Sequence, residues 1–293
     1  MCAHRSRFTG LLACAFAATI IALGSPVRAV DGVIEINQAS VTAAGGFPYV
    51  ISSSGSYRLT SDLDVPDVNT TGISITSANV SLDLNGFTLG CSSCAGAGSG
   101  RGIASSSSNV TVRNGTLQGT GNTGIELSGY YARIDGVRVI GTNSAGIDCG
   151  SHCSVANSTA AENTSTGIGV GSYGSVVNCT ANENTGSGIG TSLETNLLGN
   201  VASRNLIHGI AGNRSLVADN VATGNGQNGI FCATCTVVRN QIYNNGQEGL
   251  LAAGSTGYGS NQIDTNNGGN LNPQVSGGFE IGVNVCGGDL ICP

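Results

Sequence analysis

Three segments of the chain repeat one pattern: NVASRNLIHGI at residues 200–210, NVATGNGQNGI at 220–230 and NQIYNNGQEGL at 240–250. Each begins with Asn, has a second Asn at its sixth position and ends in Gly followed by Ile or Leu. The Gly recurs every 20 to 22 residues through most of the chain, at Gly102, Gly124, Gly146, Gly167, Gly188, Gly209, Gly229 and Gly249. The first Asn, or an Asp, recurs in parallel at Asn114, Asp135, Asn157, Asn178, Asn200, Asn220, Asn240 and Asn261. A period this long and regular indicates a solenoid with one turn per repeat.

Short β-type segments flank these Asn positions. The residues two before and two after them are small or β-branched, as in Val155 and Thr159, or Val238 and Ile242. This alternation predicts strands with one buried face. Stacked turns would place equivalent strands ~4.8 Å apart, with Ile filling the interior and each Asn bonding to the Asn above and below. Leucine-rich and helical repeats do not fit, because their leucine spacing and helix-forming residues are missing.

The composition excludes several classes of protein. The chain has 47 glycines, only 10% charged residues and a net charge of −6, and all of its basic residues other than histidine are arginines. Abundant glycine excludes a helical bundle or a coiled coil. An acidic, lysine-free chain is a poor partner for nucleic acid and for anionic membrane surfaces.

The first 29 residues have the three parts of a secretory signal peptide. They are the basic segment Arg5–Arg7, the apolar run Leu11–Gly24 and the small-residue end at Ala29. Cys14 follows Leu-Leu-Ala as in a lipoprotein box, but it lies inside the apolar run rather than after it. We therefore expect export to the periplasm or the extracellular space, with no membrane insertion of the mature chain.

The cysteines outside this segment form short-range couples. Eight of the nine pair along the sequence as Cys91/Cys94, Cys149/Cys153, Cys232/Cys235 and Cys286/Cys292. Export favours structural disulfides, whereas zinc binding would need two distant CxxC pairs to meet in an extended fold. Cys179 is left over, either as a small buried thiol or as an exposed reactive one.

The repeated segments resemble a known group of proteins. Asn109-Val-Thr-Val-Arg-Asn-Gly, Val238-Arg-Asn-Gln-Ile-Tyr-Asn-Asn and the repeated Gly-Ile are similar to right-handed parallel β-helix proteins of the pectin-lyase-like class with PbH1 repeats, over about residues 55–270. The resemblance implies an all-β, right-handed parallel β-helix solenoid. We expect about nine turns over residues 72–270, an N-terminal cap at 30–71 and a C-terminal cap at 271–293. The catalytic motifs of pectate lyases, polygalacturonase-like hydrolases and alginate epimerases are absent from the sequence.

A candidate site follows from the position two residues after each repeated Gly, which should point outward. Along the stack these residues are Glu126, Asp148, Gly169, Gly190, Ala211, Phe231 and Leu251. The small-residue stripe has two carboxylates at one end and two apolar groups at the other. Glu126 and Asp148 would lie ~5 Å apart, where like charges raise a pKa or attract a cation, unless both are simply solvated surface acids.

A second group of residues lies in the loop after this strand. Tyr130, His152 and Tyr173 each precede their Asn or Asp by five residues, which predicts an imidazole between two phenols beside the acids. His and Tyr can act as base and acid in removing the proton α to a uronic-acid carboxylate. Arg101 and Arg133 are candidates to hold that carboxylate, and Phe231 to contact substrate farther along. The alternative is that the aromatic side chains only shield strand edges.

No cofactor motif is present. Calcium binding by Glu162-Asn163 and Glu183-Asn184 is the alternative, although neither pair has the residue spacing of a calcium loop.

Two functions remain open from the sequence. One is an exported monomer that binds or processes a long, acidic polysaccharide along the stripe, by lyase- or epimerase-type proton abstraction if it is an enzyme. The other is a non-catalytic surface or matrix protein whose rigid rod serves adhesion or spacing.

Overall fold

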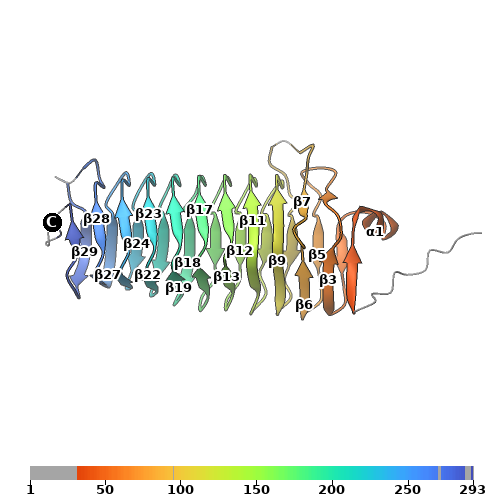
Figure 1. Cartoon of the computed structure of the whole chain (residues 1–293), viewed down its shortest axis with the longest axis horizontal. Helices are drawn as coiled ribbons and strands as arrows, with labels where there is room; N and C mark the ends of the chain where they lie inside the picture. Colours follow the sequence, from red (N-terminus) through yellow and green to blue (C-terminus); the bar gives the residue numbers. More distant parts are fainter. Residues whose placement is uncertain (1–31, 95, 270–271, 288–291, 293) are drawn as a thin grey trace, which may run out of the picture.

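The protein is an elongated parallel β-helix (Figure 1). The computed structural model describes residues 32–94, 96–269, 272–287 and 292. The solenoid has about twelve turns, and every strand pairing in its described part is parallel, with equivalent residues of successive turns in register. The right-handed parallel β-helix predicted from the repeat is confirmed. The expected signal peptide at 1–29 lies outside the described residues.

Three stacks of strands form the walls of the solenoid. The first stack contains the Gly-Ile strands: β2 (Tyr49–Ile51), β5 (Ile73–Ile75), β8 (Ile103–Ser105), β10 (Ile125–Leu127), β12 (Ile147–Cys149), β15 (Ile168–Val170), β18 (Ile189–Leu193), β21 (Ile210–Asn213), β24 (Ile230–Ala233), β27 (Leu250–Gly259) and β29 (Val275–Glu280). The second stack contains β1 (Val33–Ile36), β3 (Gly55–Leu59), β6 (Val80–Asp83), β9 (Val110–Gln118), β11 (Arg133–Ile140), β13 (Ser154–Ala156), β16 (Ser175–Val177), β19 (Asn196–Leu198), β22 (Leu216–Ala218) and β25 (Thr236–Val238). The third stack contains β4 (Leu63–Asp64), β7 (Thr88–Gly90), β14 (Thr159–Ala161), β17 (Thr180–Asn182), β20 (Val201–Ser203), β23 (Val221–Thr223), β26 (Gln241–Tyr243), β28 (Gln262–Asp264) and β30 (Val285–Cys286).

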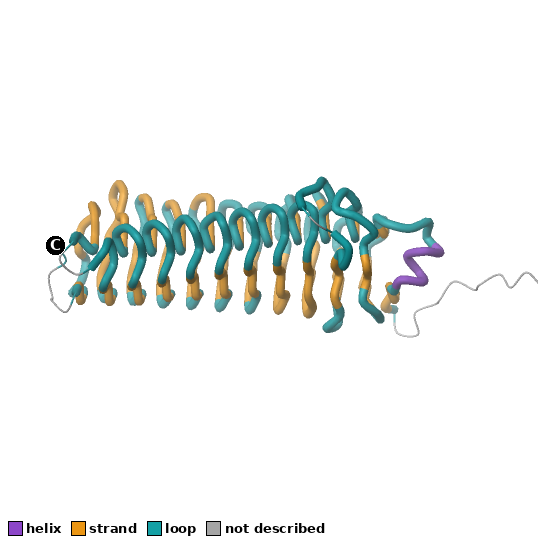
Figure 2. Tube along the Cα trace, turned by 90° about the horizontal axis from the view of Figure 1, so that it is seen from above, coloured by secondary structure: helices purple, strands orange, loops and turns teal. Residues whose placement is uncertain are grey.

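Four long strands run from one stack into the next. β9 and β11 continue from the second stack into the third, and β27 and β29 continue from the first into the second. Loops join the stacked strands in a regular row along the solenoid (Figure 2). Among the described residues, no helix has the length and apolar character that crossing a bilayer requires.

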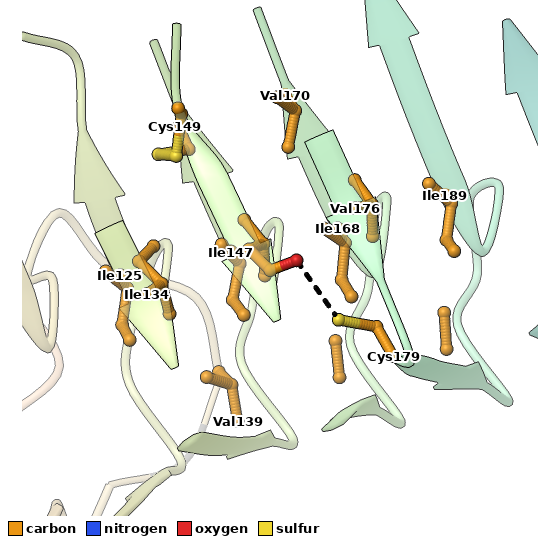
Figure 3. Close-up of a cluster of buried hydrophobic side chains, with 14 of the residues drawn as sticks. Ile125, Ile134, Val139, Ile147, Cys149, Ile168, Val170, Val176, Cys179 and Ile189 are labelled. Carbon is orange, nitrogen blue, oxygen red and sulfur yellow. Dashed lines mark hydrogen bonds between the residues drawn. A yellow bond between two sulfur atoms is a disulfide. The ribbon is translucent and has the colours of Figure 1, made fainter. Parts of the chain in front are cut away.

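The interior is a column of aliphatic side chains. Ile125, Ile147, Ile168 and Ile189 are register partners on successive turns, and each is fully buried (Figure 3). When side chains alternate between inward and outward along each strand, the inward residues of successive turns stack into one column. The buried Ile column therefore confirms the predicted alternation.

A ladder of buried asparagines closes one bend in six successive turns. It runs through Asn163, Asn184, Asn205, Asn225, Asn245 and Asn266. At each step the side-chain amide donates to the Oδ1 of the next Asn, as from Asn184 Nδ2 to Asn205 Oδ1 at 2.9 Å. The backbone N–H of Asn184 donates to the same oxygen at 3.1 Å. Gln274 ends the ladder by accepting from Asn266.

This ladder explains the repeated glycine from Gly146 onward. A Cβ on Gly167 would lie 2.6 Å from Asn184 Nδ2 and 2.7 Å from the carbonyl oxygen of Gly188. Any side chain at this position would push the ladder amide out of place, so only glycine fits.

The other predicted Asn series combines two neighbouring positions of the turn. Asn200, Asn220, Asn240 and Asn261 are buried and bonded as a ladder. Asn157 and Asn178 instead lie at the preceding, left-handed position, with φ of 50° and 53°. In later turns Gly199, Asp219 and Arg239 hold that left-handed position. The buried ladder position is thus one residue later in the turn than the left-handed position, whereas the sequence prediction treated the two as one position.

Cys179 occupies the ladder position one turn before Asn200. Its N–H donates to Asn200 Oδ1 at 2.9 Å, and its thiol contacts the carbonyl oxygen of Val155 (Figure 3). The prediction that Asn178 bonds to Asn200 is therefore wrong, whereas the predicted bond to Asn220 is present at 3.0 Å. Burial raises the pKa of the Cys179 thiol to about 11, as expected for the buried alternative.

The predicted count of nine turns is too low. Strands β1 to β4 pair in parallel with the first repeats, and β29 and β30 pair with the last ones. The sequence count misses them because the first turns are longer than the repeat, so that Tyr57 pairs with Leu82 and Leu82 with Val112. Helix α1 (Gln38–Ala43) lies at the N-terminal end of the solenoid, with a capping box between Asn37 and Ser40 (Figure 1). A capping role for 30–71 and 271–293 stays a prediction.

All four predicted cysteine couples are disulfides: Cys91–Cys94, Cys149–Cys153, Cys232–Cys235 and Cys286–Cys292. The zinc alternative is therefore excluded for these cysteines.

Candidate functional site

Glu126 and Asp148 are register partners on β10 and β12, as the stripe predicts. Arg101 forms an ion pair with Glu126, so one of the two carboxylates is neutralised. Among the described residues, Asp148 has no ion-pair partner. Desolvation by the neighbouring strands, and then the Glu126 charge, raise the pKa of Asp148 above its usual range. Asp148 is therefore an unpaired acid on the outer face of the first stack.

A shallow groove of about 590 Å³ begins at Asp148 and follows the small-residue stripe. Its floor consists of Gly169, Gly190 and Ala211, which face outward on successive turns. Its sides carry the hydroxyls of Thr123, Ser144, Ser165, Thr166, Thr191 and Ser192. Thr123 is buried, but Ser165 and Ser192 are exposed, and the floor residues lack large side chains, so the groove is open to a ligand lying along the axis of the solenoid.

An exposed aromatic cluster lies in the turns beside this groove. It consists of Tyr130, Tyr131, His152 and Tyr173. His152 stacks on Tyr173 with ring centroids 5.2 Å apart, and it contacts Tyr131 at 4.9 Å and Tyr130 at 6.2 Å. The three tyrosines are 56–60% exposed, which is unusual for such large rings. The rings therefore form one continuous surface over three turns.

Tyr131 is the functional candidate that the sequence prediction missed. Tyr131, His152 and Tyr173 are equivalent positions with φ of 60°, 59° and 62°, whereas Tyr130 precedes that position by one residue. The error arises because Gly136, rather than Asp135, is the equivalent of Asn157. Asn109, Glu194, Arg214 and Thr234 have the same left-handed conformation in other turns. This backbone geometry thus belongs to the turn, and the aromatic side chains are what distinguishes the cluster.

The groove and the aromatic cluster are neighbours along the chain. Gly171 lines the groove and Tyr173 follows two residues later, a span of at most ~7 Å. The Cys149–Cys153 disulfide closes the loop that carries His152, and Cys149 also lines the groove. The groove and the aromatic cluster are therefore carried by adjacent segments of the same turns.

Arg133 and Phe231 are not among the residues that line the groove. Arg133 is on β11 in the second stack, where it forms an ion pair with Asp135 at 3.2 Å. Phe231 is the register partner of Ala211, the last residue of the groove floor, and lies four turns from Asp148, a separation of ~19 Å along the axis. It stacks on His208 with ring centroids 5.3 Å apart, and burial lowers the pKa of that imidazole.

The calcium alternative does not fit the side-chain directions. Asn163 and Asn184 point into the interior ladder, and Glu183 forms an ion pair with Arg204 at 2.7 Å. In the described part of the chain, no group of three or more His, Cys, Asp or Glu side chains is arranged to hold a metal ion.

A second cavity, of about 580 Å³, lies near the N-terminal end, where Asp62, Asp64 and the Cys91–Cys94 disulfide contribute to its lining. Asp62 accepts a hydrogen bond from the backbone N–H of Thr88. Asp64 accepts from both the N–H and the hydroxyl of Ser92, which lowers its pKa. These bonds give both carboxylates a role in holding the local turns.

No protein-family model and no curated protein sequence matches the chain. Several solved structures are similar to it. The A-module of the mannuronan C-5 epimerase AlgE6 from Azotobacter vinelandii has a TM-score of 0.61 and 16% identity, covering 84% of this chain and 87% of that module. The A-module of AlgE4 from the same organism has a TM-score of 0.53 and 16% identity, covering 81% and 74%. The tailspike gp49 of Acinetobacter baumannii bacteriophage Fri1, a capsular polysaccharide depolymerase, has a TM-score of 0.56 and 11% identity, covering 91% and 65%. At these identities the likeness is one of fold: the chain shares the parallel β-helix of these proteins.

Proposed function

We propose that this protein binds an extended extracellular polysaccharide along the groove and the adjoining aromatic cluster. The observation that carries the proposal is the exposed surface of Tyr130, Tyr131, His152 and Tyr173, in a chain with only 4% aromatic residues. Exposed rings supply flat apolar contact area at low entropic cost, and the adjacent hydroxyls supply hydrogen bonds. The polysaccharide-acting proteins of similar fold support this ligand class.

A catalytic form of the proposal uses His152 as the base and a neighbouring phenol as the acid. The contacts of His152 with Tyr131 and Tyr173 favour it. Proton abstraction α to a carboxylate also needs a cation on that carboxylate, but Arg101 and Arg133 are already engaged by Glu126 and Asp135. We therefore propose binding as the primary function.

The catalytic form has its own test. If the protein cleaves or epimerises a polymer, His152→Ala should lower turnover by ~100-fold and leave binding largely intact, because general base catalysis contributes at least that factor. His208→Ala should change turnover little, since His208 lies near Phe231. Full activity of the His152 variant would remove the assignment.

Binding is tested by affinity electrophoresis of the secreted protein in gels that contain a panel of polysaccharides. The double variant Tyr131→Ala and Tyr173→Ala should bind about thirtyfold more weakly, since each of the two ring contacts is worth roughly 1 kcal/mol. Tyr243→Ala is the matched control, because Tyr243 is 37% exposed on β26 in the third stack. Unretarded migration of the wild type in every gel would contradict the proposal and favour the non-catalytic rod.

A further inference from the structure

The charge distribution at the groove bears on which polysaccharide it accepts. The sequence contains no lysine, and the groove lining contains no arginine. Of the arginines in the described part of the chain, those at 58, 101, 113, 133, 204, 214 and 239 form ion pairs with Asp or Glu. Arg138 is the exception, and it lies on the part of β11 that belongs to the third stack, between Thr116 and Thr159. In the described part of the chain, no arginine therefore lines the groove, and Arg101, on the turn before Glu126, is already paired with that carboxylate.

The one charged side chain of the lining is Asp148. Glu126, its partner on the preceding turn, is held by Arg101. Arg101 holds Glu126 through its Nε, so a ligand carboxylate that approached the guanidinium would share it with Glu126 and would lie on the turn next to the unpaired Asp148. An anionic polymer would thus meet uncompensated negative charge on a protein that is already acidic.

We infer that the groove selects a glycan without carboxylates, whose hydroxyl or ammonium groups donate hydrogen bonds to Asp148. This inference rests on the proposed polysaccharide-binding function and departs from the acidic polymer expected from the sequence. Asp148 is an acceptor with no competing cation, and the Ser and Thr hydroxyls of the groove both donate and accept. An amino sugar satisfies this arrangement best, because an ammonium bound to a carboxylate forms a charge-assisted hydrogen bond.

The experiment compares three hexasaccharides of equal length by isothermal titration calorimetry: glucosamine, glucose and galacturonate hexamers. The glucosamine and glucose hexamers should bind the wild type at least tenfold more tightly than the galacturonate hexamer. Asp148→Asn should weaken glucosamine-hexamer binding at least tenfold. Glu162→Gln is the matched control, because it removes the same charge from an exposed position outside the groove.

The outcomes separate this inference from the function on which it rests. Tighter binding of the galacturonate hexamer would overturn the selectivity and leave polysaccharide binding standing. Equal weakening of glucosamine-hexamer binding by Asp148→Asn and Glu162→Gln would show attraction by net charge alone, and would also overturn it. No binding of any hexamer would remove both proposals. Asp148→Asn should keep the wild-type melting temperature, so that a loss of binding is not a loss of fold.

Discussion

Gly188 and Gly190 lie two residues apart on one turn and face opposite sides of the wall. A Cβ on Gly188 would lie 2.5 Å from Asn205 Nδ2 and 2.8 Å from the carbonyl oxygen of Gly209. A Cβ on Gly190 would meet only the Thr166 methyl group, at 3.5 Å. One glycine is therefore required by the interior ladder, while the other keeps the groove floor open.

This contrast gives a matched pair of variants. Gly188→Ala should lower the free energy of unfolding by about 2 kcal/mol or more, because overpacking displaces a buried ladder amide. Gly190→Ala should change it by less than about 0.5 kcal/mol. Urea denaturation followed by circular dichroism measures both. Similar denaturation midpoints for the two variants would contradict the steric role of the repeated glycine.

Asn200 tests the second ladder in the same way. Its amide donates to Asn220 Oδ1 and to the carbonyl oxygen of Val176, and its Oδ1 accepts from the Cys179 N–H. Asn200→Leu should cost about 1–3 kcal/mol of stability, because it leaves buried backbone groups without partners. Ser203→Ala, on the outer face of β20, is the control and should have little effect. Equal melting temperatures for the two variants would show that the ladder bonds do not matter.

At the scale of the element, position and register decide what each side chain does. The period of the Gly-Ile pairs was sufficient to predict the strands, their inward Ile residues and the pairing of Glu126 with Asp148. It was insufficient at the bends, because Asn is suited both to a left-handed turn position and to a buried ladder position. Asn178 and Asn200 look equivalent in sequence but occupy these two different positions. The same one-residue shift is the reason that the sequence prediction named Tyr130 and missed Tyr131.

The ion pairs formed by the arginines that the sequence proposed for the site could not be predicted from the sequence either. Arg101 to Glu126 and Arg133 to Asp135 depend on side-chain directions that the repeat does not determine. The turn count failed for a related reason, since the N-terminal strands have longer connections and no Gly-Ile signal.

Cys179 provides a prediction at this scale. Its Sγ contacts the carbonyl oxygen of Val155 at 3.6 Å, the contact that Asn200 makes one turn later to Val176 at 2.8 Å. Cys179→Asn should extend the ladder by one turn and raise the free energy of unfolding by about 0.5–1.5 kcal/mol. The shift in urea midpoint relative to the wild type measures it, with Cys179→Ala as the variant that removes the thiol alone. A midpoint for Cys179→Asn below that of Cys179→Ala would refute the equivalence.

At the scale of the whole molecule, about twelve turns produce a rigid rod ~58 Å long. Its interior is held by aliphatic and asparagine columns that extend over many turns. Its outer surface is free to vary, because outward residues do not affect the pairing of the strands. The aromatic cluster brings three exposed tyrosines and His152 into mutual contact beside the groove, and this is the physical basis for assigning the two surfaces a function.

The central claim is that a polysaccharide lies in the groove beside the aromatic cluster, and a steric block tests it most directly. Gly190→Phe would place a ring on the groove floor, where the glycine leaves open space, and Ser203→Phe would add the same ring to β20 in the third stack. Titration calorimetry with the hexasaccharide that the wild type binds most tightly should show at least tenfold weaker binding for Gly190→Phe and unchanged binding for Ser203→Phe. Wild-type affinity in a folded Gly190→Phe variant would contradict the account.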